Sequence, residues 1–345
     1  MDKLSQIQKS LLNSMVNDEK LCNKKLYSAG PYWNYKTKKI LYWLKKKGIK
    51  NFRGLNSSVG SSYSDNIVLD YRNELGFRGR MVSLITYLPL INKIYESQIK
   101  RTYSYIQNYI KQNAIAYKNN ERVKSLISKY IIKDTVKYDC ALKFEYQGEE
   151  YSSHYLNLCD RLDIISKYIN YKNVSTFFEI GGGFGSYVHL LLNNFPNMKK
   201  VLYLDMVPNL FLGTEYLRHF YGEAVKDYNF LKGKEKITFS NNQDLEILCI
   251  APWQIESVNI SIDHFHNAAS FQEMPGHVIA NYVKYINKLL KKDSSISLIC
   301  YDGSPSNETF DPISINKFFN NSLSEKQYPI LNDEKKINYY LIFNN

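Results

Sequence analysis

A glycine cluster between an apolar segment and a helical segment is the feature that most constrains how this 345-residue chain can fold. The cluster reads Phe177-Phe-Glu-Ile-Gly-Gly-Gly-Phe-Gly185. Residues 176–180 have the apolar, aromatic character of a buried strand, and residues 186–194 have helical spacing. Glycines at such a junction allow a sharp turn and let the backbone approach a ligand that a Cβ would push away. The pattern predicts a strand–turn–helix unit that binds a ligand at its turn.

Strand and helix patterns alternate from residue 141 to the C-terminus. The sequence predicts strands at residues 176–180, 201–204, 247–251, 260–265, 297–301 and 338–343. It predicts helices at residues 153–169, 186–194, 209–220 and 277–290, and residues 236–240 compete as a further strand. This alternation implies a parallel, doubly wound sheet with right-handed crossovers. We therefore expect an α/β, Rossmann-like domain over residues 141–345.

The spacing of the glycines favours one nucleotide cofactor over another. Glu179, Gly181, Gly183 and Gly185 match ExGxGxG, whereas the nicotinamide fingerprint GxGxxG needs a glycine where Ser186 stands. The spacing therefore prefers S-adenosylmethionine to NAD. The Glu179 carboxylate, at the strand end, could neutralise a methionine ammonium directly or through water.

An acidic residue ends the next predicted strand. Asp205 follows the apolar run Val-Leu-Tyr-Leu about 20 residues after the glycines, where such an acid commonly accepts both ribose hydroxyls. The alternative is that Asp205 caps the helix that begins soon afterwards. Adenine needs an apolar slot, for which Pro252 and Trp253 are candidates, and Met206 is a further candidate contact. Trp253 could instead be ordinary core.

Three more residues are candidates for contact with the cofactor. Tyr155 and Arg161 precede the first strand of the domain and could close over the methionine moiety. Arg161 could equally form a surface ion pair. Asn267 follows the predicted fourth strand, close to the expected crevice.

Titratable residues gather around the end of the predicted strand at 260–265. They are Asp263, His264, His266 and Glu273. Ligands of doubly wound sheets bind outside the carboxyl ends of the strands, and removal of a hydroxyl proton needs a base within reach. We expect His266 or Glu273 to be that base. The alternatives are a structural histidine and a glutamate that caps the next helix.

A metal site is not expected. Asp263, His264, Glu273 and Asp302 all lie near predicted strand ends, but their spacing matches no recognised ligand pattern. A requirement for a divalent cation stays open.

The first 140 residues differ from the rest in charge and in periodicity. The net charge is +12, of which residues 1–140 carry +16 and residues 141–345 carry −4. Helical patterns cover residues 1–22, 33–47 and 81–133, the last broken at Pro89. A basic helical region attracts nucleic acid, anionic lipid, or a phosphorylated or nucleotide-linked substrate. We expect residues 1–140 to recognise an anionic acceptor, to cover the site or to form a homodimer; the alternative is a merely solvated helical surface.

Composition excludes several classes of protein. Hydrophobic residues make up 44% and charged residues 23%, which is ordinary for a globular protein. No run approaches the length of a membrane span, and no apolar segment follows the N-terminus as in a secretory signal. The five cysteines are scattered and never paired as CxxC, which is typical of reduced thiols in a cytoplasmic protein.

Three stretches resemble the bacterial sugar O-methyltransferase family, within the class I methyltransferases. They are Phe178-Glu-Ile-Gly-Gly-Gly-Phe-Gly-Ser186, Leu204-Asp-Met-Val-Pro-Asn-Leu-Phe-Leu212 with Glu215-Tyr-Leu217, and Asn267-Ala-Ala-Ser-Phe-Gln-Glu-Met274. The resemblance covers residues 140–300, and before them only Trp33 and the Phe52-Arg53 region. It implies a seven-stranded methyltransferase sheet, S-adenosylmethionine as cofactor, and a sugar hydroxyl, or a group on a sugar, as acceptor. Such families commonly serve the synthesis of surface polysaccharides such as capsules.

Two other classes of function remain open at this point. The basic half and the 30 tyrosines are compatible with an RNA methyltransferase or an RNA-binding protein. The chain lacks an Asn-Pro-Pro-Tyr-like motif after the fourth strand, however, so nucleic acid is not the expected partner. The second of these classes is an assembly partner that keeps the methyltransferase fold without catalysis.

Overall fold

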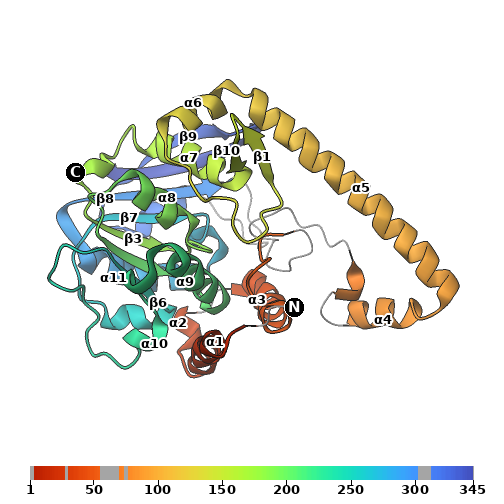
Figure 1. Cartoon of the computed structure of the whole chain (residues 1–345). Coiled ribbons are helices and arrows are strands. Elements are labelled where there is room, and N and C mark those ends of the chain that lie inside the picture. The colour runs from red at the N-terminus through yellow and green to blue at the C-terminus, as the bar shows by residue number, and fades with distance from the viewer. Residues whose placement is uncertain (1–3, 28–29, 55–69, 74–76, 302–311, 345) are drawn as a thin grey trace. The chain divides into compact units, whose positions relative to one another are not determined.

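The structure is a computed structural model that describes residues 4–27, 30–54, 70–73, 77–301 and 312–344 (Figure 1). The chain divides into two compact units, which are described separately. One comprises Met1–Ser5 with Tyr35–Asn157, and the other comprises Gln6–Asn34 with Leu158–Asn345. Residues 6–34 thus group with the C-terminal sheet, and residues 141–157 group with the N-terminal helices.

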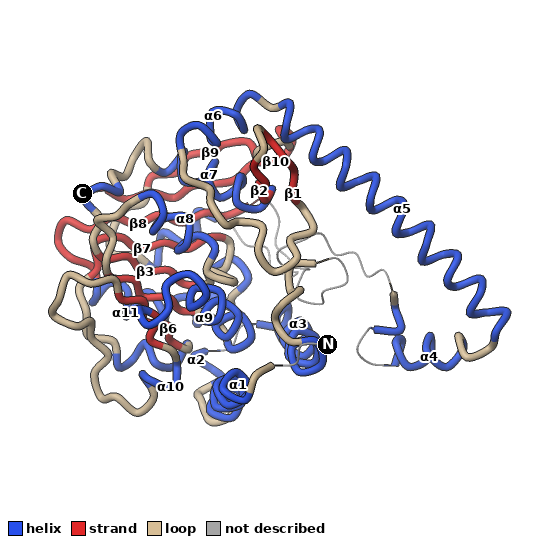
Figure 2. Tube along the Cα trace, viewed as in Figure 1, coloured by secondary structure: helices blue, strands red, loops and turns tan. Residues whose placement is uncertain are grey.

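An eight-stranded sheet forms the centre of the second unit (Figure 2). Its order is β5-β6-β4-β3-β7-β8-β10-β9. The first six strands in this order are parallel, and β10 is antiparallel to both of its neighbours, β8 and β9. The strands are β3 (Thr176–Ile180), β4 (Lys200–Leu204), β5 (Val225–Lys226), β6 (Glu246–Ile250), β7 (Ile262–Ala268), β8 (Leu290–Tyr301), β9 (Ser324–Ile330) and β10 (Asp333–Asn344).

Helices pack on both faces of this sheet. The helices of this unit are α1 (Gln6–Glu19), which packs on α9 and α10, α2 (Lys24–Tyr27), most of α7 (Ser153–Ile165), α8 (Ser186–Asn194), α9 (Val207–Tyr221), α10 (Tyr228–Leu231) and α11 (Gly276–Leu289). All five residues of β3 are buried, as expected of a parallel strand covered on both faces. Phe178 and Phe265 pack with Val278 of α11 on one face, whereas Phe177 packs near Tyr187 of α8 on the other.

The strand order reverses between β3 and β7. From β3 the chain proceeds outward through β4 on one side, and later returns to add β7 and β8 on the other side. In doubly wound sheets, this switch point opens a crevice at the carboxyl ends of the strands, where ligands bind. The glycine turn that follows β3 lies at this point.

The expected doubly wound Rossmann-like class is confirmed, although some details differ. The sheet has eight strands rather than seven, because the two-residue β5 adds to its edge. Residues 236–240 do not form a strand, and only Ile237 makes an isolated bridge, to Val258. Finally, β7 extends to Ala268 instead of ending at residue 265.

The first unit is mostly helical. Its elements include most of α3 (Gly30–Lys47), then α4 (Phe77–Ile85), α5 (Pro89–Asn119) and α6 (Glu121–Lys129), followed by the hairpin of β1 (Lys143–Tyr146) and β2 (Glu149–Ser152). Pro89 lies in the first turn of α5, where its missing N–H costs nothing. Arg53 is buried, and its guanidinium donates to the carbonyl of Thr135 and to Ser152 Oγ.

All five cysteines are described, and all are free thiols. Among the described helices, none is long and apolar enough to cross a membrane.

Candidate active site

The turn after β3 needs glycine for reasons internal to the protein. Gly181, Gly183 and Gly185 have φ values of 77°, 67° and 80°, a conformation that side chains disfavour. A Cβ on Gly181 would lie 2.2 Å from Ser270 Oγ, which follows β7. A Cβ on Gly185, which precedes α8, would lie 2.9 Å from the Leu217 side chain of α9. The glycines therefore let β3, β7 and α9 meet closely at the switch point.

Glu179 lies just before this turn and is almost completely buried, with 2% of its surface exposed. Its Oε2 atom has no hydrogen-bond partner among the described residues. Burial, and next the nearby charge of Asp205, raise the pKa of the Glu179 carboxyl to about 8. A buried acceptor without a donor is costly, and such groups commonly mark the place of a ligand.

Asp205 lies at the end of β4 and is tied to the glycine turn. Its Oδ2 atom accepts a hydrogen bond of 2.7 Å from Gly183 N–H, and its Oδ1 atom accepts one of 2.7 Å from Met206 N–H. The residue that precedes α9 is Met206, and no side chain caps this helix, so the capping alternative is not observed. Burial raises the pKa of Asp205 to about 7, although its hydrogen bonds oppose the shift.

Glu273 brings a third carboxylate to the same region. Its Oε2 atom accepts a hydrogen bond of 2.7 Å from Trp33 Nε1, and its Oε1 atom accepts a longer one, of 3.5 Å, from the Tyr301 hydroxyl. The charge of Glu273 is close enough to contribute to the raised pKa of Asp205. Pro275 precedes α11, so Glu273 does not cap that helix. The sequence patterns did not assign Trp33 to the site, and the family resemblance included this residue without giving it a role.

His264 and His266 lie within β7 rather than beyond its end, because the strand continues to Ala268. His264 is fully buried, and its ring nitrogens contact the hydroxyls of Ser295 and Ser297 at 2.8 and 2.9 Å. Burial lowers its pKa to about 3. His266 stacks on Tyr187 with 4.4 Å between ring centroids, and burial lowers its pKa well below the usual value. Both rings are therefore neutral and belong to the core.

The placement of Asp263 at a carboxyl strand end is wrong. Asp263 is the second residue of β7 and lies at the amino ends of the strands, whereas the glycine turn lies at their carboxyl ends. Its carboxylate accepts hydrogen bonds from the backbone of Ser175 and Thr176 and pairs with Lys291 at 2.5 Å. These contacts join the beginnings of two strands, so Asp263 has a structural role there.

Asn267 holds the ends of two strands together. Its Nδ2 atom donates to the Ile180 carbonyl at 2.8 Å and to Ser270 Oγ at 3.2 Å, and its Oδ1 atom accepts from Phe271 N–H. The amide is thus committed to positioning Ser270 over the glycine turn. Direct contact with a cofactor is not its evident role.

Arg161, on α7, has no hydrogen bond or ion pair with any residue that the structure describes, so the surface ion pair is not observed. Its charge lies near enough to His266 to contribute, after burial and His264, to the lowered pKa of that ring. His266 is paired in register with Glu179 on the neighbouring strand. Arg161 is therefore a cation close to the residue that pairs with Glu179.

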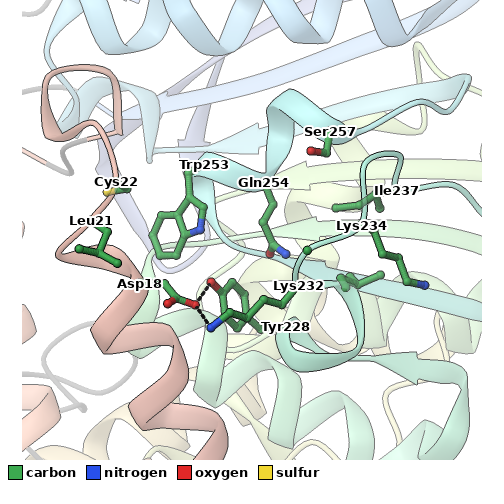
Figure 3. A pocket seen from close by; sticks show the side chains of 12 residues that line it. Asp18, Leu21, Cys22, Tyr228, Lys232, Lys234, Ile237, Trp253, Gln254 and Ser257 are labelled. Atoms are coloured by element: carbon green, nitrogen blue, oxygen red, sulfur yellow. Dashed lines mark hydrogen bonds and ion pairs between the residues drawn. The ribbon is translucent and has the colours of Figure 1, made fainter.

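Trp253 borders a pocket of about 420 Å³ next to the end of β6 (Figure 3). Tyr228 packs edge-on against its indole ring, and Asp18 accepts a hydrogen bond from the Tyr228 hydroxyl and pairs with Lys232. Pro252 precedes Trp253 in the first turn of a short 3₁₀ helix, Pro252–Ser257, and is buried.

Tyr282 is a buried residue of α11. Burial raises the pKa of Tyr282, and the charges of Tyr27, Asp205 and Cys22 add to the effect. Cys22 also borders the pocket, so a residue of the pocket and Asp205 both lie close enough to Tyr282 to affect its pKa.

Two further predicted residues are not among the described residues of the second unit. Tyr155 is buried in the first unit, where Arg53 lies over its ring at 5.8 Å. Asp302 is outside the described residues. Within the described part of the chain, no three His, Cys, Asp or Glu side chains are grouped so that they could hold a metal ion.

Comparison with solved structures finds several methyltransferases of low sequence identity. The mitomycin 7-O-methyltransferase is 14% identical with a TM-score of 0.35, over 56% of this chain and 57% of that one. A SAM-dependent methyltransferase from Aquifex aeolicus is 15% identical, with a TM-score of 0.38, over 55% of this chain and 93% of that one. Magnesium protoporphyrin IX methyltransferase from Synechocystis is 10% identical, with a TM-score of 0.37, over 56% and 80%.

No family model and no curated protein matches the sequence. The chain also covers little more than half of the length of the first solved structures that it resembles. It covers 52% of the pyocyanin biosynthetic protein and 57% of the mitomycin 7-O-methyltransferase. Likeness at this distance does not assign a chemistry, so the case for function rests on the residues at the switch point.

Proposed function

We propose that the protein is an S-adenosylmethionine-dependent O-methyltransferase that acts on a sugar hydroxyl or on a group attached to a sugar. The observation that supports this most directly is the buried Glu179 carboxylate beside the glycine turn, whose Oε2 atom has no donor in the part of the chain that the structure describes. Asp205 and Glu273 add two more acids to the same region.

The residues present fit this cofactor. Its ammonium and sulfonium groups are cationic, and Glu179 and Asp205, two buried acids with raised pKa values, favour a cation nearby. Glu179 would hold the ammonium, Asp205 the ribose hydroxyls, and Arg161 the methionine carboxylate. Asp205 is already bonded to Gly183, but each carboxylate oxygen has a second lone pair with which to accept a hydroxyl. The pocket beside Trp253 offers an aromatic wall for adenine.

The cofactor would supply a methyl group already activated by its positive sulfur, so the protein needs mainly to align, to exclude water and to accept a proton. Glu273 is the base that we propose, because Trp33 and Tyr301 hold its carboxylate in a fixed position near Asp205. His266 is buried and keeps a contact of 2.7 Å with Ser297 Oγ, which suits a positioning role better than proton transfer to an acceptor.

The family resemblance and the charge of the chain support a sugar as the acceptor. Residues 1–140 carry +16, which suits a phosphorylated or nucleotide-linked saccharide. We place the reaction in the cytoplasm, during assembly of a surface polysaccharide, and assign to the basic region the recognition of this acceptor.

Transfer of a labelled methyl group tests the proposal. The purified protein, S-adenosylmethionine and saccharide precursors from the producing cells should yield a methylated saccharide. Mass spectrometry of glycans from a deletion strain should show the loss of one methylene unit. Label transfer to RNA instead of saccharide would favour the nucleic-acid class, and cofactor binding without any transfer would favour a non-catalytic partner.

A further inference from the structure

The segment made of α4 and α5, residues 77–119, exposes apolar side chains that a folded protein ordinarily buries. The helix α5 is 31 residues long, and its buried residues are Ile106 and Tyr117 (Figure 1). Large apolar residues are exposed at both ends of α4, in the turn that follows it and at the beginning of α5. They are Phe77, Leu84, Tyr87, Leu88, Leu90 and Ile94, each with between 58% and 84% of its surface exposed.

The same segment is strongly basic. Residues 77–119 contain seven Lys and Arg residues and one acid, Glu96. Glu96 forms an ion pair with Arg72 at 2.8 Å, so it is already engaged by a cation outside the segment. The excess positive charge of α4 and α5 is therefore not balanced within the segment.

The cations and the apolar residues of α5 lie side by side along the helix. Lys93, Lys100, Lys111 and Lys118 are exposed and are separated by 7, 11 and 7 residues, which puts them on one face of an α-helix. Leu90 and Ile94 are four residues apart and lie on the adjacent face. A stripe of lysines next to exposed aliphatic residues is the pattern of a helix that lies in a membrane interface.

We propose that the α4–α5 segment docks on the surface of an anionic lipid bilayer, with the turn between the helices in the lipid interface. The lysines would neutralise lipid phosphates, and Leu84, Leu88 and Leu90 would enter the boundary of the acyl chains. No described helix could cross a membrane, so this contact is peripheral. The inference does not depend on methyl transfer.

Charge and side-chain chemistry favour this occupant over two others. A second copy of the segment would bring two strongly positive lysine stripes together without acids to pair them. Nucleic acid would use the lysines but would leave the leucines and Ile94 exposed. An anionic bilayer satisfies both kinds of side chain at once.

Cosedimentation of the full-length protein with vesicles tests the proposal. We expect binding to vesicles that contain phosphatidylglycerol, and at least tenfold weaker binding to pure phosphatidylcholine vesicles or in high salt. Leu88→Glu/Leu90→Glu and Lys100→Glu/Lys111→Glu should each reduce the binding at least tenfold. Ile7→Glu is the matched control, because Ile7 is 77% exposed on α1 and should be neutral. Circular dichroism should show all variants folded.

Failure of the folded wild-type protein to bind anionic vesicles would overturn the inference, as would binding that neither double variant weakens. A dimer that Leu88→Glu/Leu90→Glu converts to monomer, without vesicle binding, would assign the surface to a second copy. Binding of single-stranded RNA that Lys100→Glu/Lys111→Glu abolishes, again without vesicle binding, would assign it to nucleic acid.

Discussion

The carboxylate of Asp205 accepts a hydrogen bond of 2.7 Å from the backbone N–H of Gly183. The acid that the sequence assigns to ribose and the turn that it assigns to the cofactor are thus one structural unit. A change at either residue should therefore affect both the shape of the crevice and its chemistry, and variants need controls that separate the two effects.

Gly181→Ala should destabilise the protein by about 1–3 kcal/mol, because the alanine must adopt positive φ and its Cβ meets Ser270. Gly233→Ala is the control for backbone strain alone, since Gly233 also has positive φ but nothing lies within 4 Å of an added Cβ. Chemical denaturation should show a smaller loss for Gly233→Ala, and Ser270→Gly should partly restore Gly181→Ala. Equal losses for the two alanine variants would mean that the contact with Ser270 is unimportant.

The stability of the ligand-free protein should fall as pH rises from about 4 to about 8. The folded-state pKa values of Glu179 and Asp205 are raised from 4.5 and 3.8 to about 8 and about 7, so the folded state holds these protons more tightly than the unfolded state. Their stabilising contribution is complete below the unfolded pKa values and is lost as pH rises through the folded ones. Thermal unfolding should show the fall, and Glu179→Gln should flatten it. A wild-type profile that is already flat contradicts this account of the two acids.

Arg161→Met should weaken the binding of S-adenosylhomocysteine but not that of methylthioadenosine, which lacks the amino-acid carboxylate. Loss of one charged hydrogen bond predicts roughly tenfold weaker binding. Arg72→Met is the matched control, since Arg72 pairs with Asp70 in the other unit and should affect neither ligand. Weakening of both ligands by Arg161→Met would assign Arg161 a structural role.

Glu273→Gln should lower kcat by about 10²–10⁴ while leaving the affinity for cofactor nearly unchanged, as expected for loss of a general base. Trp33→Phe removes the donor to Glu273 and should lower kcat less. His266→Ala tests the other candidate. Full turnover of Glu273→Gln would exclude it as the base, and a selective loss of kcat in a folded His266→Ala protein would return that role to the histidine.

The regular part of the fold could be predicted because its signals are local. The strand at 176–180 and the helix at 186–194 coincide with β3 and α8 to the residue, since an apolar run and a glycine turn define them. The edge strand β9, Ser324–Ile330, was missed because its sequence, SEKQYPI, is mostly polar and contains a proline.

The candidate site was predicted less completely, because its contacts join distant parts of the chain. Nothing in the local sequence indicates that Trp33 donates to Glu273, 240 residues away. The predicted strand ended three residues before β7 does. His264 and His266 were therefore expected in the crevice beyond the strand end, whereas they lie inside the strand and in the core. The acids at the ends of β3 and β4 were found because each follows an apolar strand directly.

Calorimetric titration of S-adenosylmethionine into the wild-type protein and into Asp205→Ala tests the central claim most directly. We predict saturable binding of one molecule per chain, weakened at least about tenfold by Asp205→Ala, with a circular dichroism spectrum like that of the wild type. Absence of binding to the wild-type protein, or equal affinity in a folded Asp205→Ala protein, would contradict the assignment of the switch point as a cofactor site.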